Sequence, residues 1–366
     1  MILQLVVLIP ALTTGCQRQP PPELAVWSEF LPPSEVAPHL PELAAHRATL
    51  YLAIRPDSLG DDLADLIREA RTSGVDVQAW LQLPEMGIWV NEQSAAAFAR
   101  FAFDYLTWAD GQRITPQWII FDLEPPLSLA DALTETVASD GVLAATDLLA
   151  ANRDPQAFDV ATGVLAQLVD DLHARDVRAG AVILPWIIDD LSDGDTDLAD
   201  AFDTPLLGID WDRISAILYR PTFAEFFGTP LSPGFVSSYT SSLRRHFGDK
   251  VEIALGNIGD AGLFVGTGYT DTRRIVEDLT AVRAAGANRI SLFSLDGMLM
   301  TGGPRRWLEA ATSDTVWQSQ IDLRVALIRT GLGLFDRTLD NGPGQPAPGA
   351  AGTEGVGVSK PTGIRM

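Results

Sequence analysis

Residues 118–125 read WIIFDLEP, a short apolar run that ends in two acids and a proline. Side chains alternate along a β-strand, so Ile120, Asp122 and Glu124 share one face, while the residues between them form an entirely apolar face. Such a strand suits a parallel sheet that is covered by helices. We therefore expect the apolar face to pack against helices and the acidic face to point into a barrel, with Glu124 at its rim.

Seven further segments show comparable apolar runs, and helical patterns separate several of them. The eight predicted strands are Leu24–Ser28, Thr49–Arg55, Val77–Leu83, Trp118–Glu124, Arg178–Leu184, Ile214–Tyr219, Val251–Asn257 and Asn288–Leu295. Alternating strands and helices are typical of a parallel α/β fold, and eight strands close a barrel. The structural alternative, an open doubly wound sheet, usually carries a glycine-rich phosphate turn that is missing here. We therefore predict an α/β fold, the (β/α)₈ TIM barrel.

The connections between the strands carry helical patterns. Asp61–Thr72, Phe158–Arg175 and Asp271–Ala285 place apolar side chains at helical spacing. Two connections, Pro125–Pro155 and Trp186–Asp212, are longer than the fold needs. Loops that follow strands lie at the C-terminal rim of a barrel, where barrel enzymes carry their sites. The sequence therefore places extra structure beside the predicted site.

The composition restricts the partners of the chain. Its 366 residues include 26 basic and 48 acidic side chains, which give a net charge of -22. Such a surface repels phosphate backbones, so we expect no nucleic-acid partner, whereas neutral, cationic and sugar-like ligands remain compatible. The four histidines are scattered and form no zinc site or Ser-His-Asp set. We predict neither a cofactor nor a metal, and the sequence identifies no protein partner.

The N-terminal segment has the features of an export signal. Ile2–Leu12 is apolar and too short to cross a bilayer, and LTTGC follows it at residues 12–16. This resembles a bacterial lipobox, in which the cysteine is lipidated and becomes the mature N-terminus. Cys16 is the one cysteine of the chain. We therefore expect an exported protein that a lipid on Cys16 anchors to a bacterial membrane; the alternative is a plain secretory leader with an incidental cysteine.

These features define the expected domain organisation. The segments are a lipoprotein signal peptide at 1–16, a proline-rich tether at 17–23, the barrel at 24–312, a C-terminal helix at 313–340 and a disordered tail at 341–366.

The two acids of the fourth predicted strand are the best candidates for chemistry. Two carboxylates that lie two residues apart in a partly dry barrel mouth cannot both ionise cheaply, so one pKa should rise. The result is a carboxylic acid that can donate a proton near neutral pH beside an ionised partner. The alternative is a structural ion pair of Asp122 or Glu124 with Arg55 or Arg220, which also fall at predicted strand ends.

Three strand-end segments together resemble glycoside hydrolase family 18, the chitinase-like enzymes. Asp122-Leu123-Glu124 resembles the end of the family's Asp-x-Asp-x-Glu motif, residues 217–220 (ILYR) resemble its Tyr segment, and residues 291–297 (SLFSLDG) resemble its closing segment. The resemblance extends from about Leu24 to Leu308. Ile120 stands in place of the family's earlier Asp, and Phe293 in place of the Trp below the sugar. Gln82-Leu83-Pro84 replaces a Gly-Gly pair, so a divergent branch or a related barrel family of glycosidases fits better than a chitinase.

The resemblance implies a role for each matching residue. Glu124 would be the general acid toward the glycosidic oxygen, Asp122 would orient the 2-acetamido group of the substrate, and Tyr219 would hydrogen-bond the carbonyl of that group. The acetamido oxygen would then be the nucleophile. We therefore expect a glycoside hydrolase that acts on a glycan containing N-acetylhexosamine.

Further rim residues are expected to contact the sugar or to support the acids. Tryptophans suit sugars because their faces pack against C–H groups, although barrel core is the alternative for such rings, including Trp27 and Trp80. The expected substrate-binding residues are Gln82, Trp89, Arg55, Trp186, Arg220, Phe293 and Asp296. Asp296 is also the reserve candidate for a base or nucleophile, or else a helix cap.

One acidic loop offers a second place to look for a ligand. Asp189, Asp190, Asp193, Asp195 and Asp197 alternate in part, as in a calcium loop, but no glutamate closes the pattern. We therefore expect a solvated loop.

Two other functions remain open. Ile120 and Phe293 favour a non-catalytic glycan-binding lipoprotein on a degenerate barrel. A glycosidase of the ordinary two-carboxylate type, acting on a neutral sugar, is the enzymatic alternative.

Overall fold

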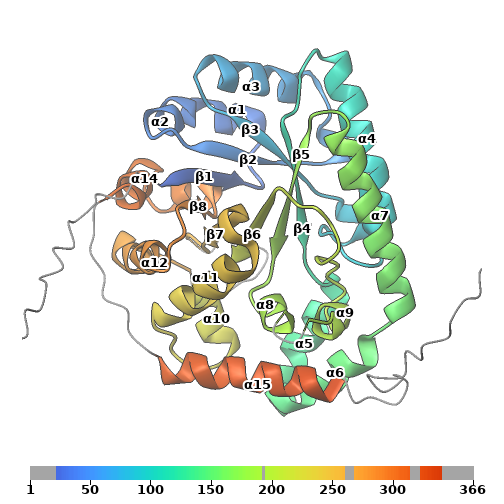
Figure 1. Cartoon of the computed structure of the whole chain (residues 1–366). Helices are drawn as coiled ribbons and strands as arrows, with labels where there is room; N and C mark the ends of the chain where they lie inside the picture. Colours follow the sequence, from blue (N-terminus) through green and yellow to red (C-terminus); the bar gives the residue numbers. More distant parts are fainter. Residues whose placement is uncertain (1–21, 192–193, 260–267, 314–321, 340–366) are drawn as a thin grey trace, which may run out of the picture.

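The computed structural model describes residues 22–191, 194–259, 268–313 and 322–339 (Figure 1). Within these ranges eight parallel strands close into a barrel, in which each strand pairs with the next and β8 pairs with β1. The strands are β1 (Glu23–Ser28), β2 (Thr49–Ile54), β3 (Val77–Leu81), β4 (Trp118–Leu123), β5 (Arg178–Ile183), β6 (Arg213–Ile217), β7 (Val251–Leu255) and β8 (Arg289–Leu292). The predicted TIM barrel is confirmed.

Every predicted strand overlaps an observed one, and the differences lie mainly at the C-terminal ends. Glu124, Tyr219 and Asn257 were predicted as the last residues of strands, but each lies just beyond its strand. The βα loops begin there, so these side chains lie at the barrel rim.

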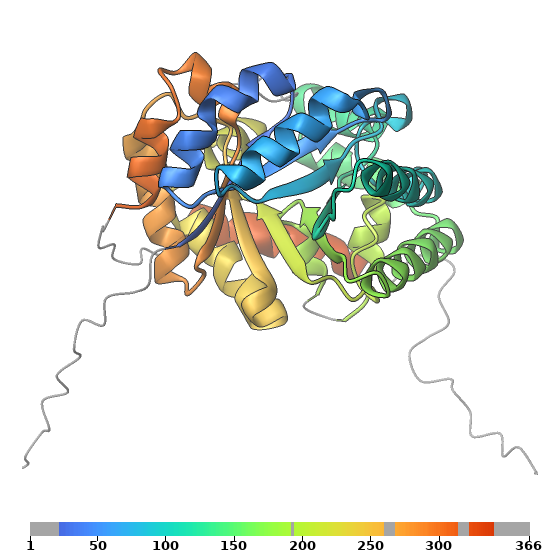
Figure 2. The same cartoon turned by 90° about the horizontal axis from the view of Figure 1, so that it is seen from above.

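Helices surround the strands, as the view from above shows (Figure 2). The α-helices are α1 (Pro33–Val36), α2 (Leu40–Ala45), α3 (Asp61–Thr72), α4 (Ala95–Gly111), α5 (Leu127–Asp140), α6 (Val142–Asn152), α7 (Pro155–His173), α8 (Ile187–Asp190), α9 (Asp197–Ala201), α10 (Arg220–Phe226), α11 (Gly234–Phe247), α12 (Thr272–Ala284), α13 (Leu295–Met300), α14 (Arg305–Ala311) and α15 (Leu323–Leu339). The 3₁₀ helices are η1 (Ala37–His39), η2 (Pro56–Ser58), η3 (Pro84–Met86) and η4 (Gly248–Lys250).

The helix boundaries follow from local capping chemistry. α3 has the predicted limits. α7 begins three residues earlier than predicted, because Asp154 accepts the backbone N–H of Ala157 at 3.1 Å and Pro155 occupies the first turn. Asp271 caps α12 in the same way, through the N–H of Arg273. The two long connections contain α5 and α6 in one and α8 and α9 in the other.

The predicted leader, Cys16 and tail lie outside the described residues, as do positions 314–321 of the predicted terminal helix. The remainder of that helix is α15, which packs against α8, α9 and α11. Among the helices of the described residues, none combines the length and the apolar character that crossing a membrane requires.

The lower half of the barrel interior contains a buried polar cluster, which we name the floor network: Tyr51, Gln78, Arg213, Ser215 and Glu252. The Glu252 carboxylate accepts hydrogen bonds from the hydroxyls of Tyr51 and Ser215, each at 2.6 Å, and pairs with Arg213 at 3.6 Å. Arg213 also donates to Oε1 of Gln78 at 3.0 Å. Every member lies near the N-terminal end of its strand, so this cluster belongs to the stability end of the barrel.

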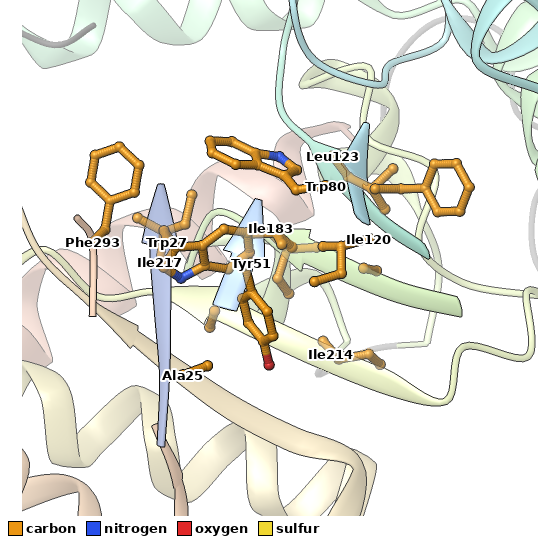
Figure 3. Close-up of a cluster of buried hydrophobic side chains, with 14 of the residues drawn as sticks. Ala25, Trp27, Tyr51, Trp80, Ile120, Leu123, Ile183, Ile214, Ile217 and Phe293 are labelled. Atoms are coloured by element: carbon orange, nitrogen blue, oxygen red, sulfur yellow. The ribbon is translucent and has the colours of Figure 1, made fainter. Parts of the chain in front are cut away.

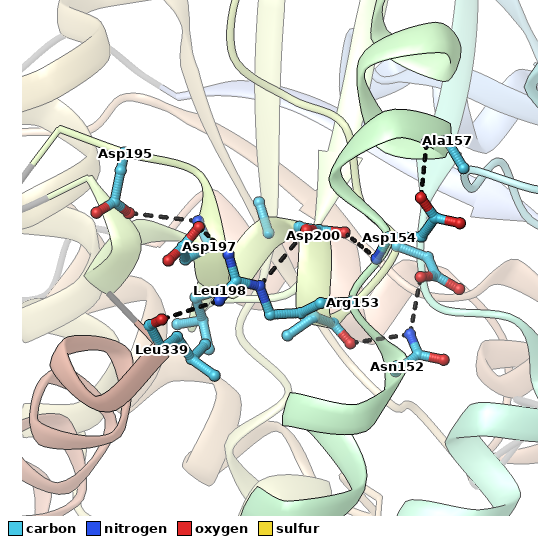
Figure 4. A network of polar contacts seen from close by, with 12 residues as sticks. Asn152, Arg153, Asp154, Ala157, Asp195, Asp197, Leu198, Asp200 and Leu339 are labelled. Atoms are coloured by element: carbon cyan, nitrogen blue, oxygen red, sulfur yellow. Dashed lines mark hydrogen bonds and ion pairs between the residues drawn. The ribbon is translucent and has the colours of Figure 1, made fainter. Parts of the chain in front are cut away.

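The expectation of a solvated loop at 189–197 is wrong for three of its acids, whereas Gly194 is exposed and Asp195 is half-buried. Asp189, Asp190 and Asp197 are buried, and Asp193 lies outside the described ranges. Arg329 of α15 donates to Asp189 at 2.8 Å, while Arg153 pairs with Asp197 (Figure 4).

The partners of the acids explain why this loop is buried. Asp190 accepts two N–H groups in the first turn of α9, those of Leu198 and Ala199, at 3.0 and 2.9 Å. A helix N-terminus stabilises a carboxylate in this position. The two arginines come from α15 and from the residue after α6, far away in sequence.

Candidate active site

A cavity of about 930 Å³ lies at the C-terminal ends of the strands. Three buried acids line it: Glu29, which follows β1, and Asp122 and Glu124 at the end of β4. Each of these three acids is only 5% exposed. The structure therefore brings three carboxyl groups into one barrel mouth, of which the sequence predicted two.

The end of β4 is held by a loop that follows β3. The backbone N–H of Val90 donates to the carbonyl of Asp122 at 2.7 Å, and the N–H of Glu124 donates to the carbonyl of Val90 at 3.2 Å. These bonds continue the strand pairing past Leu123, the last residue of β4, to Glu124. Asp122 and Glu124 therefore have fixed backbone positions, as a catalytic pair requires.

Burial raises the pKa of all three acids, and the charge of Glu29 adds to the effect at Asp122 and Glu124. Burial, and then the charges of Asp122 and Glu29, raise the pKa of Glu124 well above its ordinary value. Burial and the charge of Glu29 likewise raise the pKa of Asp122. Burial raises the pKa of Glu29 to about 7, against the lowering effects of its hydrogen bond from Gln82 and the nearby charge of Arg55. The site thus holds protonated carboxyl groups near neutral pH.

No cation compensates the β4 pair within the described ranges. Arg220 pairs with Asp278 of α12 at 2.7 Å and with Glu277 at 3.3 Å, and it also donates to the carbonyl of Leu231. Arg55 donates to Gln82 at 2.5 Å. The alternative that Asp122 and Glu124 are structural partners of these two arginines is therefore wrong.

Glu29 is the site residue that the sequence analysis missed. The available signal was its position immediately after a predicted strand, the same rim position that Glu124 occupies. Gln82 donates to Oε1 of Glu29 at 3.0 Å, and Arg55 donates to its carbonyl at 3.0 Å. Asp296 accepts the backbone N–H groups of Glu29 at 3.1 Å and of Phe30 at 2.8 Å.

Three residues that were predicted to bind the sugar instead form hydrogen bonds with Glu29. Gln82, Arg55 and Asp296 hold its side chain and backbone, and none of them lines the cavity. Arg220 does not line it either, because its guanidinium is held at α12. The reason is the same for all four: a strand-end position brings a side chain to the rim but leaves its direction open.

Aromatic rings form the wall around the acids. Trp27 packs edge-to-face on Trp80 with centroids 5.0 Å apart, and Trp80 packs on Phe293 at 6.3 Å (Figure 3). Tyr219 stacks on Phe293 at 5.6 Å with 24° between the ring planes. The predicted residues Tyr219, Phe293, Trp89 and Trp186 all line the cavity. Trp27 is part of both the barrel core and the cavity wall.

Two of these rings contain a buried donor that has no partner in the described part of the chain. The indole N–H groups of Trp27 and Trp186 are buried and have no acceptor among the described residues. A buried donor without an acceptor costs free energy, so most buried N–H groups in proteins have a hydrogen-bond partner. The cavity therefore presents aromatic rings and buried acids together, a combination that suits a polar ring with C–H faces.

Fold and site position together define this chain as a TIM-barrel protein with its candidate site at the C-terminal rim. Among solved structures it is similar to the PgaB (BpsB) glycoside hydrolase domain from Bordetella bronchiseptica, with 13% identity, a TM-score of 0.50, and coverage of 81% of this chain and 100% of that one. The spore cortex-lytic enzyme SleL from Bacillus megaterium is similar with 11% identity and a TM-score of 0.50, over 82% and 75% of the two chains.

A GH18 chitinase from Pseudoalteromonas aurantia aligns over 79% of this chain and 98% of its own, with 13% identity and a TM-score of 0.48. No family model matches the sequence, and no curated protein matches it. At these identities the likeness shows the fold alone, and the site rests on its own geometry.

Proposed function

We propose that this protein is a glycoside hydrolase that acts on a glycan containing N-acetylhexosamine. The observation that carries the proposal is the buried group of Glu29, Asp122 and Glu124, with raised pKa values, inside an aromatic cavity at the barrel rim. Glycosidic oxygens need a proton donor, and a carboxylic acid that stays protonated near neutral pH supplies one.

In the proposed mechanism Glu124 donates its proton to the glycosidic oxygen as the bond to C1 breaks. The 2-acetamido oxygen attacks C1 and forms the cyclic intermediate of the substrate-assisted route. Asp122 stabilises the acetamido N–H, and the Tyr219 hydroxyl donates to the acetamido carbonyl. Water then opens the intermediate and returns a proton to Glu124. Tyr219 lines the same cavity as both acids, which supports this division of roles.

Glu29 favours a second candidate function, a two-carboxylate glycosidase on a neutral sugar. Such enzymes need a nucleophile or base besides the acid, and Glu29 supplies an additional carboxyl group in the same cavity. In this scheme the 2-acetamido group is dispensable.

A panel of matched aryl glycosides and of oligosaccharides derived from chitin and peptidoglycan separates these possibilities. We expect hydrolysis only of substrates that carry the 2-acetamido group. Hydrolysis of substrates that lack this group would select the two-carboxylate scheme. Binding without hydrolysis of any substrate would show a glycan-binding protein instead.

We further propose that the protein is exported and anchored by a lipid on Cys16, on the basis of the lipobox-like sequence at residues 12–16. Mass spectrometry of the membrane fraction should find a diacylglycerol-modified Cys16, and the variant Cys16→Ser should be released unlipidated. A wild-type protein that carries no lipid would contradict this proposal.

A further inference from the structure

The candidate cavity has two chemically different parts. The acids lie at the strand ends, and a second part extends away from them between α5, α6, α10 and α15. We name this second part the apolar arm and define it by Leu133, Val137, Leu149, Phe226, Ile328 and Phe335. We propose that the arm binds a hydrophobic aglycone, an alkyl or acyl chain attached to the sugar that the acids cleave. This inference rests on the proposed function and narrows its substrate class.

The chemistry of the arm favours a hydrocarbon chain over a second sugar as its main occupant. Each hydroxyl of a sugar needs a hydrogen-bond partner when it leaves water, and an unpaired one costs about 1–3 kcal/mol. The six defining residues offer only hydrocarbon and aromatic surface, and few polar side chains, among them Thr134, Thr146 and Glu225, line the cavity between them. A hydrocarbon chain gains free energy there in proportion to the area it buries.

The connection between the arm and Glu124 identifies which end of the substrate enters it. Glu124 is followed by Pro125, which also lines the cavity, and α5 begins at Leu127. Leu133 and Val137 of the arm lie on that same helix. A general acid lies beside the leaving group, so the arm continues on the leaving-group side of the site.

Helix α15, which contributes Ile328 and Phe335 to the arm, is held in place by polar contacts. Arg329 of α15 donates to Asp189 at 2.8 Å and to the hydroxyl of Ser242 at 3.0 Å. At the end of the helix, Arg153 donates to the carbonyl of Leu339 at 3.0 Å. Protein interiors are otherwise close-packed, so a cavity of this size persists only where its walls are fixed. These contacts attach α15 to α8, to α11 and to the residue that follows α6.

The arm also reaches the outside of the molecule. Leu327 lines the cavity and is nevertheless 71% exposed. Gly331, one turn further along α15, also lines it. A chain longer than the arm can therefore pass out beside α15, as a membrane lipid or a long acyl chain requires.

The test uses two glycines of α15. A Cβ atom at Gly331 or at Gly333 would meet no heavy atom within 4 Å, so both positions accept a side chain. Gly331 lines the cavity and Gly333 does not. Gly331→Phe should therefore fill the arm, Gly331→Leu should fill it in part, and Gly333→Phe is the matched control. Thermal melting confirms that all three variants fold.

The probes are non-hydrolysable alkyl thioglycosides of N-acetylglucosamine, from methyl to dodecyl, measured by calorimetry. We expect the affinity of the wild-type protein to rise about three- to fourfold with each buried methylene. Gly331→Phe should abolish this dependence on chain length, and Gly333→Phe should retain it.

Affinity that does not depend on chain length would overturn the inference, as would a dependence that Gly331→Phe leaves unchanged. Dimerisation that only Gly331→Phe disrupts would assign the arm to a second copy of the chain and also overturn it. The proposed glycosidase function is tested separately. If the protein hydrolyses a short glycoside and chain length has no effect on binding, the function stands and the inference about the arm is wrong. If binding depends on chain length but no substrate is hydrolysed, the inference about the arm stands and the proposed function is wrong.

Discussion

Buried acids occur at both ends of the same barrel, and their surroundings are opposite. In the floor network, Glu252 has two hydroxyl donors and an arginine. At the mouth, Asp122 and Glu124 form no ion pair within the described part of the chain. Burying a charge is costly unless it is paired, so the floor is arranged for stability. The mouth retains an electrostatic cost, which is typical of a functional site.

The largest expected effect is on catalysis at the mouth. Glu124→Gln keeps the shape of the side chain but cannot supply a proton, so turnover should fall about 10²–10⁴-fold. The melting temperature should stay the same or rise, because a buried acid with a raised pKa has been neutralised. Steady-state kinetics and calorimetric melting measure both. A well-folded Glu124→Gln variant with near-wild-type turnover would remove Glu124 from the mechanism.

Removing one charged side chain from the floor network should instead lower the stability of the protein. Arg213→Met leaves Glu252 buried without its cation, and breaking such a pair typically costs about 3–5 kcal/mol. Urea unfolding measures the loss, and turnover per folded molecule should be unchanged. Arg273→Met is the control, since the Arg273 pair with Asp271 is exposed and should contribute little. Equal stability of the two variants would refute the distinction between floor and mouth.

Glu29 should make stability depend on pH. Its folded-state pKa is raised from 4.5 to about 7, so between these values the folded state holds a proton that the unfolded state has lost. Stability should therefore fall as pH rises from about 4.5 to 7. In the variant Glu29→Gln, the free energy of unfolding should fall less over this pH range than in the wild type, by an amount on the order of 1–3 kcal/mol. Denaturant unfolding at several pH values measures it, and parallel curves for variant and wild type would count against the buried acid.

The smallest expected effect concerns Arg55. Its charge lowers the pKa of Glu29, so Arg55→Met should raise that pKa further. Because Arg55 is partly exposed, we expect a shift of about one unit or less. Carboxyl ¹³C NMR titration of Glu29 measures the shift. Arg220→Met is the control, because Arg220 pairs with Asp278; a comparable shift in both variants would mean that Arg55 has no specific role.

The sequence predicted the features that depend on the order of neighbouring residues along the chain. Alternation in residues 118–125 placed Asp122 and Glu124 on one face, and repetition of such runs predicted the barrel. Side-chain direction at the rim depends on what packs beyond it. Arg220 pairs with Asp278, which lies 58 residues away in the sequence, and Asp189 pairs with Arg329, which lies 140 residues away. Glu29 was missed because a single acid after a strand has no local partner in the sequence to mark it.

The position of α15 has a consequence for biosynthesis. The ribosome makes the three acids of the mouth within the first 124 residues, whereas Ile328 and Phe335 of the cavity wall come more than 200 residues later. A nascent chain that has passed Tyr219 but has not yet reached Leu323 holds every proposed catalytic group but lacks one side of the cavity. The cavity wall is therefore complete only after α15 has been synthesised.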